Sequence, residues 1–382
     1  MKIGIIRWVV LTVVMAAVAG GCGQKQKQQE YFTIGALLPL TGESSDEGLR
    51  ALNGLQLAKE EINHNGGVLG KKLDIIVLND RGDEEYVVQQ YQALLKKGVI
   101  AIIGSSYSGV TLALAKEAEQ DGIPIISPTA SNPEVTKGRG NVFRAIFIDD
   151  YQAEVMAEFA RVWLNAETAV VFSSETSNSF KRASEVFAQS FRARGGQIRA
   201  VESYSDADDF ADILRKLAAA PPDVIFCPED YVPAAKLVNA VYEMGLKNTN
   251  VLGSDAWDGL LTYVYNQDAM KNIFYSAPFS FDDHDADVSE FVKKYFEAFS
   301  QMPLSGSAAA YTSLYILSEA IKKAGNTDRT ALVRAIKENE IDAIIGHIKF
   351  DEDNNPRANV YIIQIKGGEY ATYKKMSLRR EQ

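Results

Sequence analysis

The chain has 382 residues, of which 46% are hydrophobic and 24% are charged, and its formal net charge is −10. This length and composition are those of a globular protein with room for about two domains. The acidic balance argues against nucleic acid or an anionic membrane surface as the main partner.

Residues 1–22 have the pattern of an export signal rather than of a folded segment. Basic residues precede an apolar run from Trp8 to Ala19, and small residues then lead to Cys22. The run is shorter than a membrane-spanning helix requires. Small residues directly before a cysteine resemble a bacterial lipobox, although Ala19 stands where leucine is usual. We therefore expect Cys22 to be lipidated. An ordinary signal peptide cut nearby is the alternative.

The segment after Cys22 predicts a protein held at a membrane surface. Residues 23–30 (GQKQKQQE) are typical of a soluble tether. The other cysteine, Cys227, ends an apolar strand, and we expect it to pack in the core. The predicted location is the periplasm or the cell surface, with a lipid anchor.

From residue 32 onward, apolar strands alternate with amphipathic helices. The first expected strands are Phe32–Leu38, Leu73–Leu78, Val99–Ile103 and Ile123–Ile126, with helices at Gly48–Asn65, at Glu84–Lys97 and before Gly122. Short strands without a polar face are typical of a parallel sheet covered on both sides. The alternation predicts a doubly wound α/β sheet.

The alternation restarts near residue 150, which predicts a second sheet of the same kind over residues 150–275. Its expected strands are Ala169–Phe172, Ile198–Tyr204, Asp223–Cys227 and Val251–Leu252, with helices at Asn178–Arg194, Phe210–Ala219 and Val232–Met244. The rest of the chain predicts helices at Val288–Phe299, Ala308–Ala324 and Arg329–Asn339 and strands at Phe274–Phe279, Ile348–Phe350 and Val360–Ile365. Gly367-Gly368 predicts a hairpin turn after the last of these strands.

Two hydroxyl-rich loops follow neighbouring strands of the first predicted sheet. They are residues 104–109 (GSSYSG) and 127–133 (SPTASNP). Ligands of open α/β sheets bind at the carboxyl ends of the strands, near helix N-termini that favour anions. The loops therefore predict one wall of a site for a small ligand that carries an anionic group.

Several motifs occur together, in order, along the chain. They are LPLTG at residues 38–42, EINHNGGVLGK at 61–71, and shorter matches within 103–111, 126–131, 143–152, 253–257 and 349–351. In this order and spacing they resemble the leucine/isoleucine/valine-type periplasmic binding proteins, the solute receptors of branched-chain amino acid ABC transporters. The resemblance covers essentially all of the chain after the tether.

The resemblance implies a type I periplasmic binding protein, with two α/β lobes, three crossing segments and a ligand between the lobes. Lobe I is then expected at 31–148 plus 279–346, and lobe II at 149–278 plus 347–382. The implied function is capture of an amino acid or related molecule and its delivery to an ABC permease. We expect a monomer without a cofactor. A ligand-sensing receptor of the same fold, which regulates a signalling partner, is the alternative.

The resemblance also assigns candidate site residues. An amino acid brings a carboxylate, which hydroxyls bind, and an ammonium, which carboxylates and carbonyls bind. Ser108 matches a carboxylate-binding serine, Ser131 a residue that contacts both groups, and Thr129 one whose carbonyl binds the ammonium. Tyr231 and Asp255 match the aromatic and acidic partners of the ammonium.

Three further positions complete the candidate site, namely Tyr107, Phe180 and Trp257. Where relatives often have a Tyr-Gly pair, this chain has Phe180 and Lys181, and Glu47 replaces a residue that is often aromatic. These departures suit a polar ligand side chain, or else Glu47 and Lys181 are solvated surface charges.

Four of the site residues also have a local interpretation. In it, Ser108 caps the helix that follows it, and Ser131 or Asn132 caps the helix after Pro133. In the same interpretation Asp255 caps a turn, and Tyr231 packs at a helix start.

Motifs of catalysis and metal binding are incomplete throughout the sequence. Neither Ser106 nor Ser108 has the flanking glycines of a nucleophile elbow, and the three histidines are dispersed. The segment 66–72 is one residue short of a P-loop, and the acidic runs near 283 and 351 lack the glycine and closing glutamate of a calcium loop. We expect neither an enzyme nor a metal site.

Overall fold

The computed structural model describes residues 31–42, 45–265, 267–356 and 360–376. The predicted export signal, the lipidation site Cys22 and the tether lie outside these residues. Among the helices of the described part, none has the length and apolar character that crossing a membrane requires.

The first sheet has five strands in the order β2-β1-β3-β4-β5, and all neighbouring pairs are parallel. The strands are β1 Tyr31–Leu38, β2 Lys72–Asn79, β3 Ile102–Gly104, β4 Ile125–Ser127 and β5 Val142–Arg144. The connecting helices are α1 Ser45–His64, α2 Glu84–Lys96, α3 Ser108–Asp121 and the short 3-10 turn η1 Pro133–Val135. The strands β3, β4 and β5 are buried along their whole length, as expected for strands covered on both faces.

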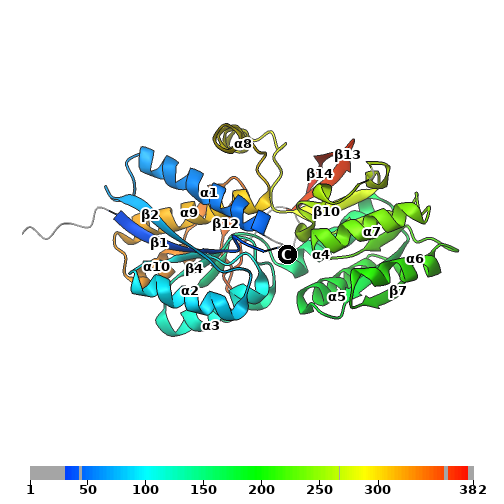
Figure 1. Cartoon of the computed structure of the whole chain (residues 1–382), viewed down its shortest axis with the longest axis horizontal. Helices are drawn as coiled ribbons and strands as arrows, with labels where there is room; N and C mark the ends of the chain where they lie inside the picture. Colours follow the sequence, from blue (N-terminus) through cyan, green and yellow to red (C-terminus); the bar gives the residue numbers. More distant parts are fainter. Residues whose placement is uncertain (1–30, 43–44, 266, 357–359, 377–382) are drawn as a thin grey trace, which may run out of the picture. The chain divides into compact units, whose positions relative to one another are not determined.

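Later parts of the chain return to this first sheet. They are α8 Ala286–Phe299, α9 Ser305–Ala324, α10 Arg329–Lys337 and the antiparallel pair β11 Glu340–Ala343 and β12 Gly346–Lys349. In Figure 1, α9 and α10 (orange) lie beside the blue and cyan elements, and one core cluster joins them to β1 and α1. At Gly54, a Cβ atom would lie 2.1 Å from the Ser307 carbonyl oxygen. Glycine therefore allows α1 and α9 to pack closely.

The second sheet has seven strands in the order β14-β13-β10-β9-β8-β6-β7. The strands are β6 Thr168–Ser174, β7 Gln197–Tyr204, β8 Val224–Phe226, β9 Asn250–Gly253, β10 Ile273–Ala277, β13 Val360–Lys366 and β14 Glu369–Met376. The helical elements are α4 Asp149–Glu158, η2 Phe159–Trp163, α5 Asn178–Ala193, η3 Ala207–Asp209, α6 Phe210–Leu217, α7 Tyr231–Glu243, η4 Asp255–Trp257, η5 Leu260–Thr262 and η6 Gln267–Met270. Strands β6 to β10 pair in parallel, whereas β13 and β14 add an antiparallel edge.

The predicted hairpin turn is present between β13 and β14. Lys366 pairs with Glu369 across a two-residue loop, in which Gly367 and Gly368 have φ of 63° and 84°. Both values lie in the left-handed region, which glycine adopts without steric cost and which matches the twist of a hairpin.

The predicted fold class, two α/β lobes built on mainly parallel sheets, is confirmed. No strand was predicted from the sequence at β5 or β11, and no helix at α4. β5 ends in Arg144 and β11 (EIDA) carries two acidic residues, so neither has the wholly apolar run that marked β3 and β4. Residues Ile348 and Phe350 belong to the first core cluster, and Asn355 accepts a hydrogen bond from Thr136 at 2.8 Å. Residues 347–355 therefore pack with the first lobe, although the sequence placed them in the second.

Candidate functional site

The loops that follow β3 and β4 are tied together by hydrogen bonds. The Thr129 hydroxyl donates to the Ser106 carbonyl at 3.1 Å, and the backbone N–H of Asn132 donates to Ser108 Oγ at 3.3 Å. Because the two strands are parallel neighbours, their loops meet at the carboxyl edge of the sheet, as predicted. We call the side chains of Ser106, Ser108, Thr129 and Ser131 the hydroxyl wall.

Helix capping does not account for Ser108. The N-cap residue of α3 is Tyr107, and no side chain caps this helix. Asn132, in contrast, caps η1, since its Oδ1 accepts from the Glu134 N–H at 2.9 Å. Of the capping interpretations for Ser108, Ser131 and Asn132, the one for Asn132 is thus confirmed. The Ser108 hydroxyl, which accepts from Asn132, retains a hydrogen that it can donate.

The second lobe contributes carboxylates that the Gln152 side chain holds together. Gln152 Nε2 donates to Asp149 at 2.9 Å and to Asp255 at 2.7 Å. Its Oε1 accepts from the Asp255 backbone N–H at 3.0 Å and from the Ser276 hydroxyl at 2.6 Å. The amide therefore orients two carboxylates that repel one another, and all its own hydrogen-bonding groups have partners.

The pKa values of both carboxyl groups, those of Asp149 and Asp255, are raised above their ordinary values. Desolvation, and then the charge of Asp149, raises the pKa of Asp255 to about 8. The pKa of Asp149 is also raised by burial, against hydrogen bonds from Ser179, Ser131 and Gln152. A cation placed beside Asp255 would relieve this repulsion and favour the ionised form. This is the arrangement that an ammonium group needs.

A further carboxyl group, that of Asp258, acts on Asp255 and contributes to its raised pKa. Asp258 Oδ2 accepts from the backbone N–H of Ser305 at 2.7 Å, which links η4 to the start of α9. We call Asp149, Asp255 and Asp258 the carboxylate wall.

Glu47 lies against the hydroxyl wall. Its Oε1 accepts from the Thr129 hydroxyl at 2.7 Å, and a hydrogen bond from Tyr107 also acts on it. Burial raises the pKa of Glu47, with further contributions from Asp258 and Asp80. Glu47 is half-buried and bonded, so it is not one of the freely solvated charges that the sequence left as an alternative.

The remaining predicted site residues, Tyr231, Phe180 and Trp257, differ in burial and in their position relative to the site. Tyr231 begins α7, as its local interpretation held, and its ring lies 5.7 Å from that of Tyr263. Phe180 is half-buried in the first turn of α5, and the adjacent Lys181 is exposed. Trp257 is fully buried in a core cluster of the second lobe, where a Cβ atom on Gly253 would lie 2.1 Å from its ring. The structure thus places Trp257 behind the site rather than at its surface.

Sequence reasoning missed Gln152, Asp149 and Asp258 as site residues. Asp149 and Gln152 fall within the motif at residues 143–152, which indicated that this segment matters but did not indicate the role of either residue. Nothing in the pattern around Asp258 marks it, because it is a single acidic residue in a loop.

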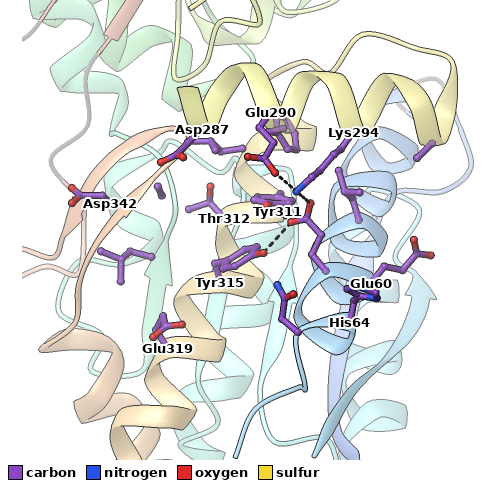
Figure 2. Close-up of a pocket in the computed structure, with 18 of the residues that line it drawn as sticks. Glu60, His64, Asp287, Glu290, Lys294, Tyr311, Thr312, Tyr315, Glu319 and Asp342 are labelled. Atoms are coloured by element: carbon purple, nitrogen blue, oxygen red, sulfur yellow. Dashed lines mark hydrogen bonds and ion pairs between the residues drawn. The ribbon is translucent and has the colours of Figure 1, made fainter. Parts of the chain in front are cut away.

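A cavity lies elsewhere, on the first lobe. It has a volume of about 980 Å³ and is lined by α1, α8, α9 and β11. Figure 2 shows Tyr311, Tyr315 and Lys294 turned toward one place, where Glu61 pairs with Lys294 at 2.9 Å and accepts from the Tyr315 hydroxyl at 3.0 Å. None of the predicted site residues lines this cavity.

Metal or thiol chemistry has no support in the part of the chain that the structure describes. No three histidine, cysteine, aspartate or glutamate side chains there form a group that could hold a metal ion. Cys227 is buried in a core cluster, as predicted, and burial raises the pKa of its thiol.

Comparisons with known proteins agree with this architecture. The sequence model of the periplasmic binding protein family matches residues 32–369. The Leu/Ile/Val-binding protein BraC3 of Rhizobium johnstonii is 26% identical over 329 residues, covering 84% of this chain and 88% of the relative. The leucine binding protein LivK of Thermotoga maritima superposes with a TM-score of 0.82 at 28% identity, covering 90% of this chain and 98% of that one. LivJ of Streptococcus pneumoniae, solved with isoleucine, gives a TM-score of 0.83 at 25% identity, covering 91% of this chain and 99% of that chain.

The chain belongs to the periplasmic binding protein family. It is a solute-binding protein that works outside the cytoplasm, and it is not an enzyme. The predicted resemblance to the leucine/isoleucine/valine-type proteins is confirmed.

Proposed function

We propose that the protein binds an amino acid or a closely related molecule between the hydroxyl wall and the carboxylate wall, and delivers it to an ABC permease. In this proposal Ser108 and Ser131 bind the ligand carboxylate. Thr129 offers its backbone carbonyl to the ammonium, and Asp255 pairs with that ammonium beside Tyr231. Tyr107 and Phe180 border the ligand side chain, whereas Trp257 supports Asp255 from the core.

One observation carries the proposal, namely the pair of hydrogen bonds between the Gln152 side chain and Asp255. The amide satisfies Asp255 Oδ1 and the Asp255 backbone N–H at once. It therefore fixes the carboxylate before any ligand arrives, and such preorganisation lowers the entropic cost of binding. The relatives are named for amino acid binding and transport, which favours transport over the regulatory receptor of the same fold.

Calorimetry against the twenty amino acids tests the proposal, with Asp255→Asn as the site variant. Asp212→Asn is the matched control, because Asp212 is an exposed residue of the same lobe that forms an ion pair with its helix neighbour Arg215. We expect at least one amino acid to bind the wild type and the control equally, and to bind Asp255→Asn much more weakly. Binding of no amino acid, or equal binding to all three proteins, would overturn the proposal.

We also propose that the mature protein is a monomer anchored by a lipid on Cys22. The support is the sequence pattern that ends at Cys22 and the polar tether after it. Metabolic labelling with a fatty acid should mark the wild type and not Cys22→Ser. Equal labelling of both proteins, or labelling of neither, would contradict the anchor.

A further inference from the structure

The cavity on the first lobe, between α1, α8, α9 and β11, has no role in the proposed function. Its volume of about 980 Å³ lies near the upper end of the range for small-molecule sites, which is about 300–1,000 Å³. None of the residues assigned to the hydroxyl wall or to the carboxylate wall lines it. A molecule bound in this cavity would therefore occupy a site separate from the amino acid site.

Part of the cavity lining is aromatic. The ring centroids of Phe291 and Tyr311 lie 4.8 Å apart, and those of Tyr311 and Tyr315 also lie 4.8 Å apart. Both tyrosine hydroxyls donate to Glu61, and Lys294 pairs with the same carboxylate (Figure 2). Because the polar ends of the two tyrosines are occupied, what they offer a ligand is their rings, which bind aromatic groups and cations.

The charged side chains of the lining are mostly acidic. Seven carboxylates line the cavity, against one lysine and one histidine. Lys294 shows how an ammonium is held here, since its Nζ lies 2.9 Å from Glu61 and 2.6 Å from Glu290. In the described part of the chain, no three acidic, histidine or cysteine side chains are grouped so that they could hold a metal ion. The lining therefore favours an organic cation over an anion or a metal ion.

A buried hydroxyl in the same lining points to a ligand independently of the charges. Thr312 is only 1% exposed, and it lines the cavity beside Tyr311 on α9 (Figure 2). Its Oγ1 has no hydrogen-bond partner among the residues that the structure describes. Buried hydroxyls are normally bonded, so this oxygen fits a ligand group that donates hydrogen bonds, as an ammonium does.

We propose that this cavity is a second binding site, which takes an arylalkylamine, a small amine that carries an aromatic ring. The ring lies against Tyr311 and Tyr315. The ammonium donates to Thr312 Oγ1 and faces the carboxylates that α8 contributes to the lining, those of Asp287 and Glu290 among them. The proposal does not depend on the amino acid function, because it uses no residue of either wall.

Three matched compounds test the proposal by calorimetry on the wild-type protein. Phenethylamine carries the ring and the ammonium, phenethyl alcohol has a hydroxyl in place of the ammonium, and hydrocinnamate has a carboxylate there. We expect the amine to bind at a single site, about tenfold or more tightly than the alcohol, because a charge-assisted hydrogen bond contributes that much. Hydrocinnamate should not bind, because the carboxylates of the lining repel it.

Thr312→Val removes the hydroxyl and keeps the branched shape of the side chain. Because the hydroxyl has no partner among the described residues, the variant should melt at or above the wild-type temperature, yet bind phenethylamine about tenfold more weakly. Ser318→Ala is the matched control. Ser318 is another buried residue of α9 whose hydroxyl has no partner among the described residues, but it does not line the cavity. The control should bind phenethylamine as the wild type does.

A second pair of variants tests the charge of the lining. Asp287→Asn removes one carboxylate of the cavity, and Asp74→Asn removes the same charge at an exposed residue of the first lobe outside the lining. Affinity for phenethylamine should fall in Asp287→Asn and stay at the wild-type value in Asp74→Asn. An equal fall in both variants would follow net charge alone and would overturn the proposal.

The remaining outcomes separate this proposal from the amino acid function. No binding of phenethylamine at millimolar concentration, or equal binding of phenethylamine and phenethyl alcohol, would overturn the cavity site and leave the amino acid function standing. An equal loss in Thr312→Val and Ser318→Ala would also overturn it. Asp255→Asn should bind phenethylamine as the wild type does. A loss of amine binding in that variant would place the amine between the two walls, against the proposal.

Discussion

The two walls of the site have opposite electrostatic properties. The hydroxyl wall follows parallel strands of the first sheet and presents neutral donors near the start of α3, where an anion is favoured. The carboxylate wall gathers negative charge around Gln152 and keeps it there at an electrostatic cost. The difference teaches that the carboxylate wall carries a repulsion that a cation would relieve, whereas the neutral side chains of the hydroxyl wall carry no such repulsion.

Removing Asp255 should produce the largest effect on binding. Asp255→Ala leaves the ligand ammonium desolvated without its partner, and such a loss weakens binding by about 2–5 kcal/mol. Calorimetry with the amino acid that the wild type binds most tightly measures it. An affinity equal to that of the control Asp212→Asn would exclude the ammonium role of Asp255.

Removing a hydroxyl from the opposite wall should have a smaller effect. Ser131→Ala removes one charge-assisted hydrogen bond to the ligand carboxylate, which is expected to weaken binding by about 1–3 kcal/mol. Ser131→Thr keeps the hydroxyl and should bind nearly as the wild type does. If the alanine and threonine variants bind equally well, the hydroxyl of Ser131 does not contact the ligand.

The pH dependence should come from the carboxylate wall alone. Asp255 must be ionised to pair with an ammonium, and its pKa is raised to about 8 in the free protein. Affinity should therefore rise with pH up to about 8 by at most about tenfold per unit, and then level off, with proton release on binding. Calorimetry in two buffers of different ionisation enthalpy measures the released proton. A flat profile with no proton release would contradict this account of Asp255.

The same raised pKa predicts the stability of the free protein. Between the ordinary pKa of 3.8 and about 8, folded Asp255 keeps a proton that the unfolded chain has lost. The free energy of unfolding should therefore fall as pH rises through this window, and Asp255→Asn should flatten the fall. Thermal melts across the window provide the test, and a steeper fall in the variant would speak against it.

The smallest effect on binding is expected at Trp257. Its side chain is fully buried, and its Nε1 has no hydrogen-bond partner among the residues that the structure describes, so its role is packing. Trp257→Phe should lower the free energy of unfolding by about 1–3 kcal/mol through the cavity that it leaves, with little change in affinity. Denaturant unfolding and calorimetry on the same sample separate the two quantities. A large loss of affinity with unchanged stability would place Trp257 in contact with the ligand.

The hydroxyl wall was predictable from the sequence because its signals are local. An apolar strand, a run of serines and a helix start stand within about ten residues of one another, as around Ser108. Asp255 and Tyr231 were predicted only through the resemblance to the family. Neither position has a local pattern of its own.

The organisation of the carboxylate wall was not predictable, because its bonds join distant segments. Gln152 lies 103 residues from Asp255 and 124 from Ser276 in the chain. The hydrogen bond from the Ser305 backbone N–H to Asp258 likewise joins η4 to α9 across 47 residues. The periodicity of a sequence does not indicate which distant segments come into contact, so these bonds become visible only in the three-dimensional structure.

The central claim is that each wall binds one end of the same ligand, and a double-mutant cycle tests it most directly. Calorimetry would compare the preferred amino acid with its α-amide and its N-acetyl form on the wild type, Asp255→Ala and Ser131→Ala. The account predicts that N-acetylation weakens binding to the wild type but adds little loss in Asp255→Ala, and that amidation does the same with respect to Ser131→Ala. If the losses from N-acetylation and from Asp255→Ala simply add, the ammonium does not pair with Asp255 and the two-wall account is wrong.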